Sequence, residues 1–238
     1  MKKIGLIGGT GPESTLMYYK ELNARIDRIT NEAQMPDVAI ESVDFRKAWR
    51  YVSSGAFDDL SDYLAQKAKA LSLGGAEVIA LTAATMHIVF QEVQNKAGVS
   101  LVSIPKAVCE AVLADGCKSV GLLGTIFTME QDYMKRDLLD AGVSVIIPDK
   151  SDRDLVARRI YEELEVGIVK ESTLNEFRDI IKKMRDNNGI EAVILGCTEL
   201  PLLLNGDNCP LPCLDSVDIH LNKLIRLAIY GDLSDAKK

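Results

Sequence analysis

The sequence is poor in aromatic and imidazole side chains and has no excess of positive charge. Aromatic residues make up 5% of the 238 residues, and there are one tryptophan and two histidines. Lysine and arginine number 28 against 35 acidic residues, which gives a formal net charge of −7 without a dense basic run. Proteins that hold nucleic acid through its phosphates concentrate basic side chains. The composition therefore argues against a nucleic-acid partner and favours a small molecule.

Long apolar runs are also missing. After Met1, Lys2 and Lys3, only Ile4 precedes a glycine, which leaves no apolar core for a secretion signal. No later run approaches the roughly 18 apolar residues that a membrane-spanning helix needs. We therefore expect no membrane association and a cytoplasmic location.

Cysteine is scarce and its number is odd. Five cysteines in a chain without a secretion signal do not predict a disulfide framework. Cys209 and Cys213 have a C-x3-C spacing, but both flank prolines in Cys-Pro-Leu-Pro-Cys and no second ligand pair follows. We predict neither a metal site nor a cofactor.

The residues that are present alternate between short apolar runs and amphipathic segments. With 47% hydrophobic residues the chain can form one large or two modest α/β domains. The expected strands lie at residues 3–8, 38–45, 76–81, 101–105, 119–125, 143–148 and 192–195. The expected helices begin near residue 13 and lie at 57–73, 108–113, 152–165, 173–187 and 216–229.

Part of this pattern occurs twice. Residues 119–125 repeat residues 3–9, and residues 191–197 repeat residues 77–83, which sets Cys197 opposite Ala83. A repeat of this kind predicts two similar halves.

The repeat sets the expected domain organisation. We expect an N-terminal domain of residues 1–100 plus 210–238 and a C-terminal domain of residues 101–209. Each should be a three-layer α/β domain with a mainly parallel sheet, and the pseudo-symmetric pair should hold the active site in the cleft between them.

Cys197 follows the apolar strand at 192–195, at a turn of small residues. Ligands of open α/β sheets collect at the carboxyl ends of the strands. Backbone N–H groups of a following helix would favour the thiolate over the thiol. Cys197 is therefore a candidate nucleophile or carbon-acid base.

The glycine turn at residues 8–15 nearly matches a dinucleotide-binding fingerprint. However, Ser14 stands at the third glycine position, Pro12 lacks a backbone N–H, and the lysine of a P-loop is missing. A small carboxylate held by Thr10 and Ser14 fits better. The alternative that these residues only cap the helix stays open.

Other polar residues have two readings as well. His87 could orient a site residue or only bond backbone, and His220 could support the site or face a helix cap. Arg46 could pair with a substrate carboxylate or lie in a solvated segment. Thr125 and Thr128 follow the second glycine turn and could hold the other end of the ligand.

Several motifs together resemble the aspartate/glutamate racemase family, which works without pyridoxal phosphate. The resemblance covers essentially the whole chain. It rests on Gly-Gly-Thr-Gly-Pro-Glu-Ser-Thr at 8–15, Val-Asp-Phe at 43–45, Thr-Met-His at 85–87, Leu-Gly-Thr at 123–125, Thr-Met-Glu-Gln at 128–131, Gly-Cys-Thr-Glu at 196–199, and Asp215 with Ile219-His220.

The resemblance implies a homodimer and a small acidic amino acid as substrate. It also implies two opposed cysteines that exchange the Cα proton from opposite faces. The family pattern in the first half is Cys-Asn-Thr or Cys-Thr-Asn-Thr-Met-His, whereas this chain has Leu-Thr-Ala-Ala-Thr-Met-His at 81–87. The internal repeat assigns the catalytic position to Ala83 and the subgroup spacing assigns it to Thr82. Ala84 also lacks the amide that would bind the substrate.

The leading hypothesis is an amino-acid racemase acting on aspartate- or glutamate-like substrates, slow or one-directional, with Cys197 on one face of Cα. Thr82, or water beside Ala83, would act on the other face. Expected substrate contacts are Thr10, Ser14, Arg46, Ala83, Ala84, Thr85, Thr125, Thr128, Thr198 and Glu199. The alternatives are a single-cysteine decarboxylase of the same superfamily and an acidic amino-acid binding protein without turnover.

Overall fold

A computed structural model describes residues 1–231. The chain forms two compact units. The first contains residues 1–103 and the segment from His220 onward, and the second contains residues 104–219. The end of the expected N-terminal domain, residues 232–238, lies outside the described residues.

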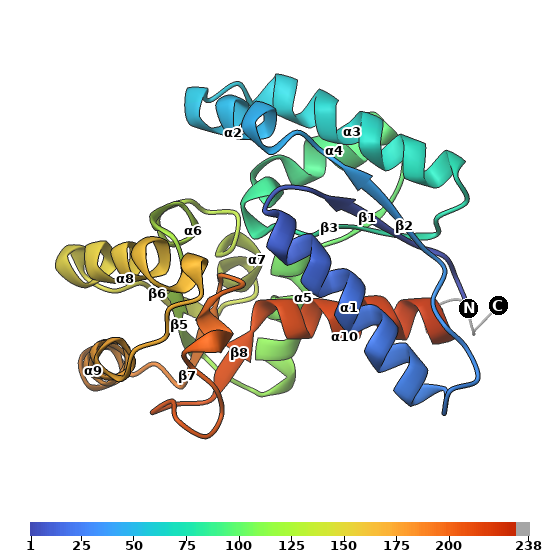
Figure 1. The fold of residues 1–238 in the computed structure, drawn as a ribbon. Helices are drawn as coiled ribbons and strands as arrows, with labels where there is room; N and C mark the ends of the chain where they lie inside the picture. The colour runs from blue at the N-terminus through green and yellow to red at the C-terminus, as the bar shows by residue number, and fades with distance from the viewer. Residues whose placement is uncertain (232–238) are drawn as a thin grey trace. The chain divides into compact units, whose positions relative to one another are not determined.

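The first unit has a four-stranded parallel sheet in the order β2-β1-β3-β4. Helices cover both faces, with α3 and α4 on one and α1 and α10 on the other (Figure 1). The strands are β1 (Ile4–Gly8), β2 (Val38–Ser42), β3 (Val78–Leu81) and β4 (Leu101–Val102). The helices are α1 (Pro12–Ile29), α2 (Phe45–Ser54), α3 (Phe57–Leu73), the 3-10 helix η1 (Ala84–Val89), α4 (Phe90–Ala97) and α10 (Ser216–Tyr230), which begins in the second unit.

The second unit repeats this architecture with a parallel sheet in the order β6-β5-β7-β8. Its strands are β5 (Ser119–Leu123), β6 (Ser144–Ile146), β7 (Ala192–Leu195) and β8 (Cys213–Asp215). Its helices are α5 (Ile104–Ala114), α6 (Ile126–Glu130), α7 (Arg136–Asp140), α8 (Lys150–Glu162), η2 (Leu164–Val166), α9 (Glu171–Asn188) and η3 (Leu200–Leu202).

The inner strands are short and fully buried, and for this reason they appear in the sequence as short apolar runs. All residues of β1, β3 and β7 are buried, as expected for the inner strands of a parallel sheet that is covered on both faces. The equal strand orders confirm the repeat and the α/β fold class. In both units the strand that precedes the glycine turn, β1 or β5, lies in the middle of the sheet.

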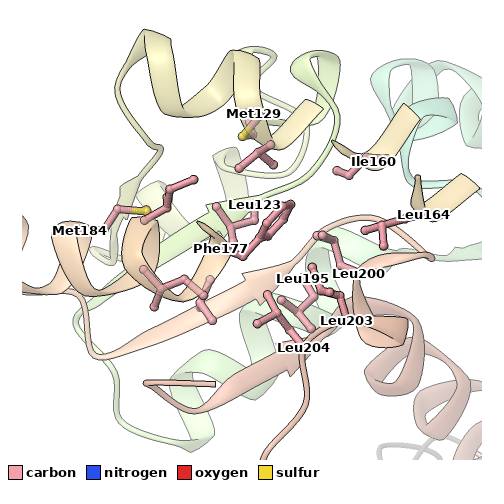
Figure 2. Packing of buried hydrophobic residues seen from close by; sticks show 14 of the residues in the cluster. Leu123, Met129, Ile160, Leu164, Phe177, Met184, Leu195, Leu200, Leu203 and Leu204 are labelled. Atoms are coloured by element: carbon pink, nitrogen blue, oxygen red, sulfur yellow. The ribbon is translucent and has the colours of Figure 1, made fainter. Parts of the chain in front are cut away.

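A hydrophobic core fills the space between the second sheet and its helices. Phe177 of α9, Leu195 of β7 and Leu200 of η3 are almost completely buried there. Figure 2 shows Phe177 with Leu123 above the strand and Leu195 with Leu200 beside it. This core fixes the carboxyl end of β7, where Cys197 follows.

Three local features differ from the sequence-based expectations. The basic-aromatic segment after β2 forms helix α2, because Asp44 caps it by accepting a hydrogen bond from the Lys47 backbone N–H. Strand β8 had not been expected, and it pairs with β7. The chain therefore returns to the first unit at His220 rather than at residue 210.

No helix within residues 1–231 is both long and apolar enough to cross a membrane.

Candidate functional site

The carboxyl end of β7 holds Cys197 through close backbone packing. The Gly196 N–H donates to the Leu123 carbonyl at 2.8 Å, which extends the pairing of β7 with β5. A Cβ at Gly196 would lie 3.0 Å from that carbonyl oxygen and from Thr128, so a larger residue would push the turn outward. The Ser216 hydroxyl donates to the Leu195 carbonyl at 2.7 Å. These contacts fix the position of Cys197.

The Cys197 thiol lies against a carboxylate. Its Sγ donates to Oε2 of Glu199 at 2.9 Å. Burial, together with the negative charges of Glu199 and Glu165, holds the pKa of Cys197 well above its usual value. The sequence had suggested a thiolate favoured by a following helix, but only the 3-10 helix η3 follows, and burial and Glu199 favour the protonated thiol instead.

Glu165 is a second carboxylate whose charge raises the pKa of Cys197, and the sequence did not suggest it. It belongs to η2, and its neighbour Leu164 lies in the same buried core as Leu200, the residue after Glu199 (Figure 2). Burial, and then the charge of Glu199, raises the pKa of the Glu165 carboxyl. Because the segments lie more than thirty positions apart in the sequence, no local pattern would have revealed this proximity.

A chain of hydroxyl groups follows the glycine turn of the second unit. Thr125 caps α6 by accepting from the Thr128 N–H at 3.2 Å. The Thr128 hydroxyl lies 3.1 Å from the Thr125 hydroxyl and 2.9 Å from the Tyr133 hydroxyl. The structure therefore brings the two predicted threonines together and adds Tyr133, which sequence reasoning missed.

The corresponding turn of the first unit approaches its helix closely. The Gly9 N–H donates to the Thr15 hydroxyl at 2.9 Å. A Cβ at Gly8 would lie 2.5 Å from Thr15 Cγ2, just as one at Gly124 would lie 2.8 Å from Thr128 Cγ2. In the repeat, Thr128 thus takes the structural place of Thr15.

Thr10 and Ser14 differ in how they are bonded. The Ser14 hydroxyl donates to the Thr82 carbonyl at 2.7 Å, which joins α1 to the end of β3. The Thr10 residue is 8% exposed, and its buried hydroxyl has no hydrogen-bond partner within residues 1–231. A buried polar group without a partner is costly, so Thr10 is the residue of this turn that a ligand would satisfy.

Thr82 and the alanines after it have different surroundings. Thr82 is 1% exposed, and its hydroxyl lies 3.4 Å from both the Thr15 hydroxyl and the Ile7 carbonyl oxygen. Ala83, Ala84 and Thr85 are half-buried at the start of η1.

Both histidines of the chain are buried in the first unit and neutral. His87 Nδ1 lies 3.1 Å from the Ala83 carbonyl oxygen and 3.2 Å from that of Ala84, and since carbonyls only accept, Nδ1 carries the proton. His220 Nε2 donates to the Val102 carbonyl at 3.1 Å, so its Nδ1 accepts from the Tyr18 hydroxyl at 2.8 Å. Burial lowers the pKa of His87 to about 4 and that of His220 to about 3.

Of the remaining predicted residues, one lies in the Cys197 turn and the other on the surface. Thr198 is half-buried between Cys197 and Glu199, whereas Arg46 is exposed in the first turn of α2. Within residues 1–231 no group of three or more histidine, cysteine or acidic side chains is arranged to hold a metal ion.

Comparison with known protein families identifies the family of this chain. The model of the Asp/Glu/hydantoin racemase family matches residues 7–224, which includes both glycine turns and the Cys197 turn. The chain belongs to the Asp/Glu/hydantoin racemase family. Membership supports an isomerase of the amino-acid racemase type.

Relatives of this racemase family cover nearly the whole chain. An aspartate racemase homologue from Pyrococcus horikoshii OT3 is 40% identical, with a TM-score of 0.86 over 96% of this chain and 99% of its own. A candidate Asp/Glu racemase from Yersinia pestis is 35% identical, with a TM-score of 0.91 over 96% of this chain and 100% of its own. The broad specificity amino-acid racemase RacX of Bacillus subtilis is 22% identical over 90% of this chain and 92% of its own.

Arylmalonate decarboxylase shares the fold. Its unliganded structure is 14% identical, with a TM-score of 0.53 over 97% of this chain and 94% of its own. At this identity the likeness extends to the fold alone.

Proposed function

We propose that the protein is a cofactor-independent amino-acid racemase in which Cys197 exchanges the Cα proton of the substrate. The observation that carries the proposal is the 2.9 Å contact between the Cys197 thiol and the Glu199 carboxylate at the end of β7. Family membership supports the same role.

The contact provides a route for the proton on one face of Cα. When Cys197 acts as the base, its thiol proton leaves through Glu199, and the thiolate then takes the Cα proton to give a planar carbanion. When Cys197 acts as the acid, its thiol gives a proton to that carbanion. Because burial and Glu199 favour the protonated thiol, we propose that the acid direction is the faster one.

The proton on the opposite face has two candidate sources. One is the Thr82 hydroxyl, and the other is water beside Ala83, which has no exchangeable side-chain proton. An alcohol is a far weaker acid and base than a thiol, and the burial of Thr82 with two hydroxyl or carbonyl neighbours supports water. Either source makes the reaction slower than one with two thiols.

For binding of the amino acid we propose polar groups at the glycine turn of each unit, taken separately. The unsatisfied Thr10 hydroxyl supports recognition of a carboxylate at the start of α1. The hydroxyl chain of Thr125, Thr128 and Tyr133 offers further hydrogen bonds. We also propose a homodimer, which light scattering after size-exclusion chromatography tests directly.

Exchange of the Cα proton in D2O tests the function. Separate L and D enantiomers of acidic, neutral and basic amino acids are incubated with the protein, and Cα deuteration is followed by NMR. We expect exchange that Cys197→Ala abolishes and that Cys117→Ala, a change of a thiol outside the site, preserves. Absence of exchange from every amino acid would refute the proposal.

A second candidate function is decarboxylation with a single cysteine. It is favoured because Cys197 is a protonated thiol and position 83 carries no thiol. Protonation of a planar intermediate from one side needs only one acid. Release of CO2 from an arylmalonate, lost in Cys197→Ala, would support it over the racemase.

A third candidate is a binding protein without turnover. The same missing group at Ala83 favours it. Calorimetry that shows micromolar binding of an amino acid, with no Cα exchange in D2O, would support this function over both enzymes.

A further inference from the structure

Two cysteines of the second unit take no part in the proposed function. Cys209 and Cys213 are the ends of the segment Cys-Pro-Leu-Pro-Cys, and Cys213 is the first residue of β8. The chain bends at Pro210 and Leu211, between the two cysteines. Both cysteines are free and half-buried. The loop before β8 therefore carries a pair of thiols that is not enclosed in the core.

One backbone carbonyl brings the two residues together. The Cys209 N–H donates to the Asn205 carbonyl at 3.0 Å, and Cys213 Sγ lies 4.0 Å from the same oxygen. Cys213 also hydrogen-bonds the side chain of Cys209. Disulfides join cysteines whose Cα atoms are about 4.4–6.8 Å apart. A short loop that folds back onto a single carbonyl is therefore suited to an S–S bond between its ends.

The same loop is anchored to the hydrophobic core of the second unit. The residues that pack against the cluster containing Leu203 include Cys209, Leu211 and Cys213. The Asn208 side chain donates to the Leu203 carbonyl at 3.0 Å. Because these contacts order the loop before any bond forms, closing a disulfide costs little additional conformational entropy.

A cationic side chain of α9 supports the reactivity of Cys209. Arg178 follows Phe177, a member of the same core, and its Nε is buried without a hydrogen-bond partner among residues 1–231. The hydrogen bond from Cys213 and, to a lesser extent, the charge of Arg178 lower the pKa of Cys209 to about 7, against the effect of burial. The thiolate is the form that attacks a disulfide. Cys209 is therefore the attacking sulfur of the pair.

We propose that Cys209 and Cys213 form a redox-active dithiol, which low-molecular-weight disulfides such as glutathione disulfide oxidise to an intramolecular disulfide. The inference goes beyond the racemase function and does not rest on it.

The reaction consists of two exchange steps. The Cys209 thiolate attacks one sulfur of glutathione disulfide, which forms a mixed disulfide and releases one glutathione thiolate. Cys213 then loses its proton to solvent and attacks the Cys209 sulfur. The mixed S–S bond breaks, the bond between Cys209 and Cys213 forms, and the second glutathione thiolate leaves. The pair is oxidised by two electrons, and glutathione disulfide is reduced to two molecules of glutathione.

The test exposes the full chain to an excess of glutathione disulfide at pH 7.5 and then alkylates the remaining thiols with iodoacetamide. Cleavage before aspartate releases residues 207–214, which contain both cysteines of the pair and exclude Cys197. Mass spectrometry should show this peptide lighter by two hydrogen atoms and unalkylated. Alkylation of the pair should fall at least fivefold, that of Cys117 should stay within about twofold, and dithiothreitol should restore the thiols.

Two variants separate the roles of the two sulfurs. In Cys213→Ala no thiol resolves the first product, so Cys209 should accumulate as a mixed disulfide with glutathione. In Cys209→Ala the attacking thiolate is missing, so Cys213 should remain a free thiol. Cys117→Ala is the matched control, and it should form the Cys209–Cys213 disulfide as the unmodified protein does.

Three results would overturn the inference. They are a peptide that stays fully alkylated, a mixed disulfide at Cys209 that persists in the unmodified protein, and modification of Cys117 to the same extent as the pair. Each would leave the racemase proposal intact, because exchange of the Cα proton uses neither thiol of this loop.

Discussion

The Cys197 Sγ donates a hydrogen bond to Oε2 of Glu199, two residues further along the chain, at 2.9 Å. A carboxylate in this position stabilises the thiol and opposes the thiolate. The thiol therefore rests in its protonated form at the end of a buried strand. This relationship determines how the reactivity of Cys197 should depend on pH.

Removal of the Glu199 charge should make Cys197 more acidic. In Glu199→Gln the carboxylate no longer repels the thiolate, so the pH profile of Cys197 alkylation by iodoacetamide should move to lower pH. Alkylation at each pH can be followed by mass spectrometry of the Cys197 peptide. An unchanged or more alkaline profile would show that Glu199 does not control the thiol.

Cys209 should react with alkylating agents before Cys197 at pH 7. A hydrogen bond from Cys213, opposed by burial and aided by the Leu211 N–H, lowers the pKa of Cys209 to about 7. At that pH a large fraction of Cys209 is thiolate, which is the reactive form, whereas Cys197 is mostly thiol.

The partner thiol supplies the control for Cys209. Cys213→Ala removes the hydrogen bond that lowers the Cys209 pKa, and it should slow Cys209 alkylation several-fold at pH 7. Cys117 is an internal reference, because burial and the charge of Glu191 raise its pKa. Equal rates for Cys117 and Cys209 would contradict the prediction.

A second thiol should accelerate the slow direction of the reaction. Ala83→Cys supplies an acid and base at the position that the repeat sets opposite Cys197, and we expect at least a tenfold gain in Cα exchange of the slower enantiomer. Ala83→Ser is the control, since an alcohol of similar size should give little gain. If both variants match the unmodified protein, position 83 is not the site of the second exchange.

Thr82→Val distinguishes the two sources of the second proton. If water supplies it, loss of the Thr82 hydroxyl should leave the Cα exchange rate within about twofold. A loss of more than tenfold in a variant that remains folded by circular dichroism would assign the role to Thr82.

The free energy of unfolding of the first unit should fall as the pH decreases below neutral. His87 and His220 have folded pKa values of about 4 and about 3, below the ordinary 6.5, so the unfolded chain binds protons that the folded chain does not. The contribution is complete above pH 6.5 and declines as the pH falls toward 4, by about 1.4 kcal/mol per pH unit for each histidine. Urea unfolding at pH 7.5, 6 and 5 measures this slope.

A variant with one histidine fewer checks the origin of that slope. His87→Asn removes one titrating group and should reduce the decline between pH 6.5 and 5, although it lowers stability at all pH values. A slope unaffected by the change would assign the pH dependence to carboxylates.

The sequence by itself determined the local elements and the repeat. Strands such as β1 and β7 were predicted because a short apolar run bounded by glycine has few other stable conformations in a folded chain. The helix α3 agrees with its predicted bounds, Phe57–Leu73. Cys197 was found from its place after β7 and from its Gly-Cys-Thr-Glu context, both of which are local.

Tertiary structure decided what lies around these elements. The pairing of β8 with β7 and the hydrogen bond between Tyr18 and His220 join residues that are far apart in the sequence. Hydrophobic patterning fixes which face of an element is buried, but the neighbour of a buried face depends on packing of the whole unit. The protonated state of Cys197 depends on its burial, which only the packed unit provides, and on the carboxylate of Glu199 two residues along the chain.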